Sequence, residues 1–169
     1  MFEGYLRALG RFELAVKGRD AGEAFIPLFE ALNWAVALDD RTATHWAPDG
    51  KVLGWSWRQR VPDAGVMGGV RFARNRVHHQ WSDALALDDG HRQYPRSYPL
   101  VYFEWVWRPA SELPVGRADA AGEAVYQGRL EGRAARATLA QLREAFAFLR
   151  RVLEPSSLVV SMADLAAYE

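Results

Sequence analysis

The segment 22–40 constrains the fold more than any other, because its apolar residues recur at the three- and four-residue spacing of an α-helix. They cover much of the circumference of the expected helix, and a helix that is apolar on most sides must be surrounded by other elements. We therefore expect residues 22–40 to form the central helix of a bundle, with Asp20 as its N-cap. The apolar positions are Phe25, Leu28, Phe29, Leu32, Ala35 and Val36.

Four other segments also show helical spacing, and the last of them carries the stripe Leu139, Leu142, Phe146, Leu149 and Val152 or Leu153. The predicted fold is mainly all-α, an antiparallel helical bundle of four to five helices with a small β insertion. We expect residues 1–169 to form a single domain, with β or loop insertions at about 41–62 and 91–118. The four further predicted helices are 1–17, 64–87, 120–132 and 136–153.

One segment has the composition of a β-strand rather than a helix. Residues 100–108 are rich in β-branched and aromatic side chains, and Pro99 and Pro109 bound them. Because a single strand is not stable alone, this strand needs a partner. Residues 52–58 are the expected partner, although they also fit a loop anchored by aromatic side chains.

Composition excludes several classes of protein. The formal net charge is zero, so any binding of phosphate must come from a local cluster of charges. The chain has no cysteine, which rules out disulfides, thiolate catalysis and cysteine-based zinc sites. It contains no P-loop or other common catalytic motif, and we expect no cofactor. No apolar run reaches membrane-spanning length and no signal-peptide core is recognisable, so we expect a cytoplasmic protein without a membrane partner.

The stretch 70–85, VRFARNRVHHQWSDAL, concentrates three arginines, an asparagine and two histidines. If it is helical, an apolar stripe of Val70, Ala73, Val77, Trp81 and Ala84 faces the core, and a polar flank lies beside it. A polar flank next to a packed stripe suits a site built on a rigid element. Gly65, Gly68 and Gly69 at the start of this helix indicate that another helix crosses closely there.

These side chains suit cleavage of RNA without a metal. A histidine titrates near neutral pH, so it can take the proton of the ribose 2′-hydroxyl or protonate the leaving oxygen. An arginine holds phosphate oxygens with a planar fork and stabilises the charge that builds up on phosphorus. Asn75 can orient a phosphate oxygen or fix the tautomer of a histidine.

The order of these residues resembles the signature of the HEPN-domain family, in which an arginine and a polar residue, often asparagine, precede a histidine by four to six intervening positions. Arg74 to His79 leaves four intervening residues with Asn75 in place, and Arg71 to His78 leaves six. The resemblance implies an all-α bundle, commonly a homodimer with the motif in the cleft between protomers. It implies a metal-independent endoribonuclease, of the kind found as a toxin or phage-defence effector, with an antitoxin or regulatory protein as a further partner.

From the resemblance we assign Arg74 and His79 as catalytic residues, with Asn75 in support, and Arg71, His78 and Arg76 as RNA- or phosphate-binding residues. On an ideal helix Arg74 and His79 lie about 140° apart, whereas Arg71 and His78 lie about 20° apart. The motif thus favours a pair of residues that one helix would point in different directions. A homodimer removes this difficulty, because two copies of the helix can contribute different flanks to one cleft. In some HEPN toxins a modified tyrosine stands where this chain has Trp81, so the resemblance does not imply that form of control here.

Other interpretations compete with this one. The alternative function is a non-catalytic helical binding or regulatory module that dimerises and binds a protein or nucleotide partner; a purely structural dimer is a third. The acidic pairs 39–40 and 88–89 are expected to be solvated at helix ends, and His45 with Asp39 or Asp40 is a weaker metal-site hypothesis. Four tryptophans are candidates for stacking on bases, although packing in the core or an interface is the stronger expectation. They are Trp55, Trp57, Trp105 and Trp107.

Overall fold

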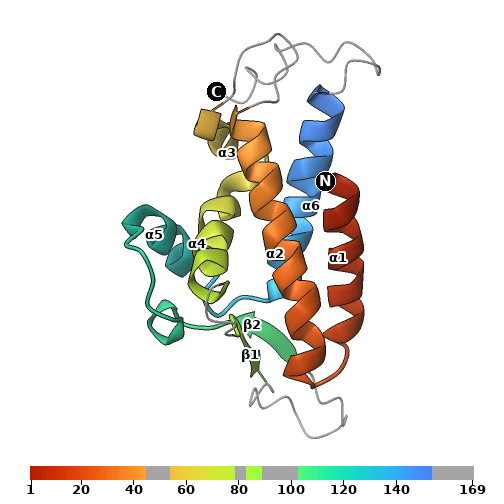
Figure 1. Cartoon of the computed structure of the whole chain (residues 1–169), viewed down its shortest axis with the longest axis vertical. Coiled ribbons are helices and arrows are strands. Elements are labelled where there is room, and N and C mark those ends of the chain that lie inside the picture. The colour runs from red at the N-terminus through yellow and green to blue at the C-terminus, as the bar shows by residue number, and fades with distance from the viewer. Residues whose placement is uncertain (45–53, 79–82, 89–102, 154–169) are drawn as a thin grey trace, which may run out of the picture.

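The structure is a computed structural model, and it describes residues 1–44, 54–78, 83–88 and 103–153 (Figure 1). It confirms a mainly helical fold with a small two-stranded antiparallel sheet. Short 3-10 turns lie at Gly54–Ser56, Ala64–Val66 and Ala110–Glu112. The elements are α1 (Phe2–Ala15), α2 (Ala21–Thr44), α3 (Trp57–Arg60), α4 (Met67–Val77), β1 (Leu85–Asp88), β2 (Glu104–Trp107), α5 (Ala120–Arg129) and α6 (Ala135–Leu153).

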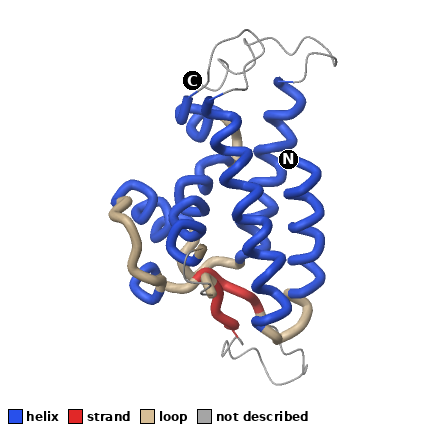
Figure 2. The backbone as a smooth tube through the Cα atoms, in the orientation of Figure 1, coloured by secondary structure: helices blue, strands red, loops and turns tan. Residues whose placement is uncertain are grey.

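Helix α2 occupies the centre of the bundle, as its apolar pattern predicts. It runs between α1 on one side and α4 on the other, with α6 behind, while α5 packs on the outer side of α4 (Figures 1 and 2). Asp20 precedes α2 as expected, and its Oδ1 accepts a hydrogen bond from the backbone N–H of Gly22 at 2.7 Å. The buried side of α2 includes Leu28, Ala31, Leu32 and Ala35, which pack against the apolar sides of its neighbours.

The predicted stripe of the last helix is confirmed, because Leu139, Leu142, Phe146 and Leu149 are all buried in the core. Tyr5 of α1 reaches across to this helix and donates a hydrogen bond to the carbonyl oxygen of Leu139 at 2.6 Å. The first and last long helices are therefore joined by both apolar packing and a buried hydrogen bond.

The predicted helix 64–87 is too long. Helix α4 ends at Val77, and residues 85–88 form strand β1 instead. Val70, Ala73 and Val77 are buried as predicted, whereas Trp81 and Ser82 lie outside the described residues. A short apolar run fits a helical stripe or a strand equally well, so the available partner decides between them. Here β2 supplies the partner, with Leu85 opposite Trp107 and Leu87 opposite Trp105.

The expected strand at 52–58 is also wrong. Within this segment the described residues form the 3-10 turn Gly54–Ser56 and the start of α3, so the strand at 104–107 pairs with β1 instead. The other edge of β2 meets the loop between α5 and α6. Trp107 donates its backbone N–H to the carbonyl of Arg133 at 3.0 Å and accepts from the N–H of Gly132 at 2.9 Å. Both edges of β2 thus have backbone partners, which explains why a strand of four residues is stable here.

The glycines at the start of α4 do mark a close crossing, as the sequence predicts. A Cβ atom at Gly69 would lie 2.8 Å from Leu130 Cδ1 and 3.0 Å from the backbone Cα of Tyr126. Real Cβ atoms do not come as close as the contact with Leu130, and the contact with the Tyr126 backbone is also unusually tight, so Leu130 and the end of α5 would have to shift to admit a side chain. The absence of a side chain at Gly69 therefore sets how closely α4 and α5 pack.

This crossing yields a stability prediction with an internal control. We expect Gly69→Ala to lower the free energy of unfolding by about 1–3 kcal/mol, the usual cost of overpacking. Gly10 lies inside α1 with open space around its Cβ position, so Gly10→Ala should raise the free energy of unfolding by about 0.5–1 kcal/mol. Urea unfolding measures both, and stabilisation by Gly69→Ala would contradict the close crossing.

Candidate functional site

Two stripes of side chains face each other where α2 and α4 run antiparallel. Three contacts join them in order: Phe29 stacks on His78, Asn33 accepts from Arg74, and Asp40 pairs with Arg71. Along each helix, the residues in these contacts are spaced by about one or two helical turns, which places them on one face of that helix. We call this arrangement the α2–α4 seam, and it consists of Phe29, Asn33, Asp39 and Asp40 of α2 with Arg71, Arg74 and His78 of α4.

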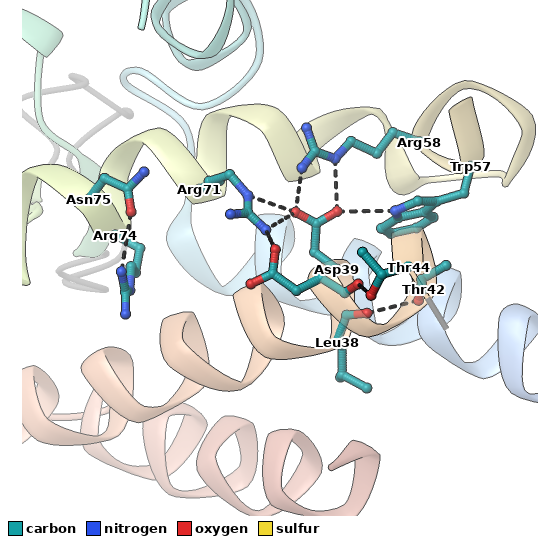
Figure 3. Close-up of polar contacts among 10 residues, drawn as sticks. Leu38, Asp39, Thr42, Thr44, Trp57, Arg58, Arg71, Arg74 and Asn75 are labelled. Carbon is teal, nitrogen blue, oxygen red and sulfur yellow. Dashed lines mark hydrogen bonds and ion pairs between the residues drawn. The ribbon is translucent and has the colours of Figure 1, made fainter. Parts of the chain in front are cut away.

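The buried carboxylate of Asp39 lies at one end of the seam and joins three helices (Figure 3). Its Oδ1 accepts from Trp57 Nε1 at 3.0 Å and from Arg58 Nε at 2.8 Å. Its Oδ2 accepts from Arg71 Nε at 2.8 Å and also binds the Nη2 atoms of Arg58 and Arg71. Asp39 is fully buried, so this set of donors replaces the water that its charge would otherwise require.

The expectation that the acidic pair 39–40 is solvated at a helix end is therefore wrong for Asp39. Helix α2 continues to Thr44, so position 39 lies inside the helix on its buried side. Asp40 does face solvent, with 53% of its side chain exposed, and it binds Arg71 Nη2. The weaker hypothesis of a metal on Asp39 loses support, because arginines and an indole N–H already occupy both carboxylate oxygens; His45 lies outside the described residues.

A sequence signal for the burial of Asp39 does exist. Leu32 and Ala35 belong to the core-facing stripe of α2, and Asp39 follows them by seven and four residues, which places it on the same stripe. A carboxylate on a core-facing stripe needs positively charged partners, because an isolated buried charge is very costly. Sequence reasoning missed this residue, and it also missed Asn33.

Arg71 is held by carboxylates. Burial by itself would lower the pKa of its guanidinium, but the negative charges and hydrogen bonds of Asp39 and Asp40 outweigh burial and raise that pKa. The predicted phosphate-binding role of Arg71 would thus compete with two carboxylates that already neutralise it.

Arg74 has a different environment. Its Nε donates to Asn33 Oδ1 at 3.0 Å and its Nη1 donates to Asn75 Oδ1 at 3.3 Å. Both acceptors are neutral amides, and among the residues that the structure describes no carboxylate lies within ion-pair distance of this guanidinium. Burial and then the like charge of Arg71 lower the pKa of Arg74, and the charge of Asp40 opposes them only in part. Arg74 is therefore a fixed cation whose charge an incoming anion would stabilise.

Of the two predicted histidines, His78 lies at the other end of the seam. The ring of His78 stacks on Phe29 with ring centroids 4.9 Å apart and planes 14° apart, one turn beyond Arg74. His79 lies outside the described residues, so the predicted pairing of Arg74 with His79 stays a prediction. The pair Arg71 and His78 does share the seam, with Arg74 between them.

The remaining two predicted residues take different directions. Asn75 is exposed, and its side-chain oxygen accepts from Arg74, so it helps to orient that guanidinium. Arg76 turns away from the seam: its Nη1 donates to the carbonyl of Pro114 at 3.5 Å, and its guanidinium carbon lies 4.7 Å from the centre of the Phe72 ring. The structure thus brings Arg71, Arg74, Asn75 and His78 together and separates Arg76 from them.

Packing is confirmed as the role of three of the four tryptophans. Trp57, Trp105 and Trp107 are buried, and the indole N–H of each donates to an acceptor within the chain. Trp55 differs, because half of its surface (50%) is exposed. It lies next to the seam, with the guanidinium carbons of Arg58 and Arg71 at 4.5 Å and 5.0 Å from its ring centre.

Comparisons of the chain with protein families, with curated proteins and with solved structures gave no match. Among the described helices, none is both long enough and apolar enough to cross a bilayer. Within the same residues, no three histidine or carboxylate side chains gather as metal ligands would. A functional proposal therefore rests on the α2–α4 seam and on the resemblance of the motif in α4.

The Asp39 network yields a second stability prediction. Asp39→Asn leaves the partly buried guanidinium of Arg58 without a carboxylate and that of Arg71 with Asp40 alone, and we expect it to lower the free energy of unfolding by about 3–5 kcal/mol. Asp40→Asn, the adjacent control, removes an exposed carboxylate and should cost about 1 kcal/mol or less. Urea unfolding measures the free energy of unfolding of both variants. Equal losses would show that the buried carboxylate of Asp39 stabilises the fold no more than the exposed carboxylate of Asp40 does.

Proposed function

We propose that this protein is a metal-independent endoribonuclease of the HEPN type, with Arg74 as the group that binds the scissile phosphate. The observation that carries the proposal is the state of this guanidinium, which Asn33 and Asn75 fix in place through neutral oxygens only. A planar fork of donors with uncompensated charge is complementary to a phosphodiester. The position of Arg74 in the HEPN-like motif supports the same role.

The proposed chemistry is transesterification within the RNA strand. The ribose 2′-oxygen forms a bond to phosphorus, the bond from phosphorus to the 5′-oxygen breaks, and a histidine imidazole accepts the 2′-hydroxyl proton. A second acid returns a proton to the leaving 5′-oxygen. Arg74 stabilises the negative charge on the phosphate oxygens during the transfer. From the motif we assign the imidazole to His79, with His78 beside the phosphate.

The proposed assembly is a homodimer, and the proposed biological role is that of a toxin or phage-defence effector under the control of an antitoxin or regulatory protein. The motif supports both statements by its resemblance to HEPN proteins. A dimer also supplies a second copy of α4, so that Arg74 of one protomer and His79 of the other can meet at one phosphate.

Expression in cells tests the catalytic proposal. We expect the wild-type protein to arrest growth and to fragment cellular RNA, and we expect Arg74→Ala and His79→Ala to relieve both effects. Arg74→Lys should rescue little, because a lysine keeps the charge but loses the planar fork. Arg7→Ala is the control, since Arg7 is an exposed arginine of α1, across the central helix from α4. Equal RNA fragmentation by wild type and Arg74→Ala would contradict the proposal.

The salt dependence of RNA binding tests the phosphate contact separately. The logarithm of the binding constant for single-stranded RNA falls with the logarithm of salt concentration by about 0.7 per neutralised phosphate. Arg74→Ala should reduce the magnitude of this slope by about 0.7 for each binding site, because one phosphate is no longer neutralised there. Arg7→Ala should leave the slope unchanged. RNA binding with an unchanged slope would remove Arg74 from the phosphate site. RNA binding without any cleavage would assign the chain to the non-catalytic binding modules.

A further inference from the structure

We infer that the exposed ring of Trp55 is a stacking platform for an unpaired nucleobase, next to the phosphate site at Arg74. The inference takes its class of ligand, single-stranded RNA, from the proposed function and adds a base-binding subsite to it. It rests on the orientation of the ring, on its rigid backing and on its distance from Arg74 along α4.

The ring of Trp55 has one covered face. The guanidinium carbons of Arg58 and Arg71 lie 4.5 Å and 5.0 Å from its centre. Both guanidiniums also bind the same oxygen, Oδ2 of Asp39, so both approach the ring from the side of that carboxylate. Half of the Trp55 surface is exposed, and we assign that exposed half to the face away from the two arginines.

The covered face is held by buried structure, which makes the ring a rigid platform. Arg58 and Arg71 are fixed by the fully buried carboxylate of Asp39, and Arg71 is fixed by Asp40 as well. The carboxylates balance the charge of these arginines, so their role at the ring is to position it by cation–π contact. A preorganised aromatic face loses little conformational entropy when a base stacks on it.

The platform lies close to the proposed phosphate site. Arg71 contacts the Trp55 ring, and Arg74 follows Arg71 by one helical turn, a rise of about 4.5 Å on α4. A nucleotide carries a flat base and a phosphate within a few bonds of each other. One strand can therefore place a base on Trp55 and a phosphate at Arg74.

The geometry selects unpaired RNA. In a duplex each base is already stacked between its neighbours, and its face is not available to a protein ring. A single exposed indole face accepts any base with an open face, and stacking of this kind tolerates sequence changes. The subsite thus predicts a preference for loops and single strands over helices.

The experiment measures binding of three fluorescent ligands to the intact protein by anisotropy. The first is a single-stranded 2′-O-methyl oligonucleotide, which lacks the 2′-hydroxyl nucleophile and stays intact. The second has the same length and phosphates but abasic residues, and the third is the first ligand paired with its complement. We expect the wild type to bind the first ligand about tenfold or more tightly than either of the others.

Two substitutions separate the base contact from the phosphate contact. Trp55→Ala should weaken binding of the base-bearing single strand by about tenfold and leave the abasic ligand unaffected, while Trp55→Phe retains most of the affinity. Arg74→Ala should weaken binding of both ligands. If Trp55→Ala binds the abasic ligand as tightly as the wild type does, the Asp39 network remains intact in that variant.

The outcomes distinguish this inference from the proposed function. If Trp55→Ala binds the base-bearing strand as tightly as wild type while Arg74→Ala does not, the platform is overturned and the phosphate site stands. Equal losses for base-bearing and abasic ligands in Trp55→Ala give Trp55 a structural role and also overturn the platform. If the preference for the base-bearing single strand depends on Trp55 but natural RNA is not cleaved, the platform is supported and the nuclease is overturned. Absence of binding to all three ligands overturns both.

Discussion

The rest of the site depends on one buried carboxylate. Asp39 lies on the core-facing side of the central helix, and its two oxygens bind Trp57, Arg58 and Arg71. These contacts hold α3 and α4 against α2, so the charge on Asp39 sets the position of both neighbours. Buried ion clusters often add less stability than apolar packing of the same volume would, so we infer that this one contributes mainly by specifying how the three helices are arranged.

The same carboxylate divides the arginines of the site into two kinds. Arg58 and Arg71 are neutralised by Asp39 together with Asp40 and act as structural supports, whereas Arg74 has neutral amide partners and keeps an uncompensated charge. Trp55 contacts both arginines of this pair, and half of its surface is exposed. One end of the seam therefore offers a flat apolar surface, and the next helical turn offers a cation. A single-stranded nucleotide has the complementary pair of features.

Much of the helical framework could be predicted from periodicity, because α2 and α6 carry long apolar stripes at helical spacing. The run at 85–88 could not be assigned in this way, since four residues fit a helix or a strand and its partner lies far along the chain. For the candidate site, the motif around Arg74 indicated the face of α4 that meets α2. Asn33 and Asp39 were missed because their roles depend on which arginine of another helix lies opposite them.

The sequence by itself determined the helical class, the central position of α2, and the concentration of arginine, asparagine and histidine on one flank of α4. These properties follow from local spacing, which the helix converts into faces whatever the neighbours are. Only the tertiary structure decided which arginines are neutralised, that Trp55 stays exposed while Trp57, Trp105 and Trp107 are buried, and which strand pairs with β1. The reason is that charge compensation and burial belong to pairs of residues, and the antiparallel packing of α2 on α4 is what brings those pairs together.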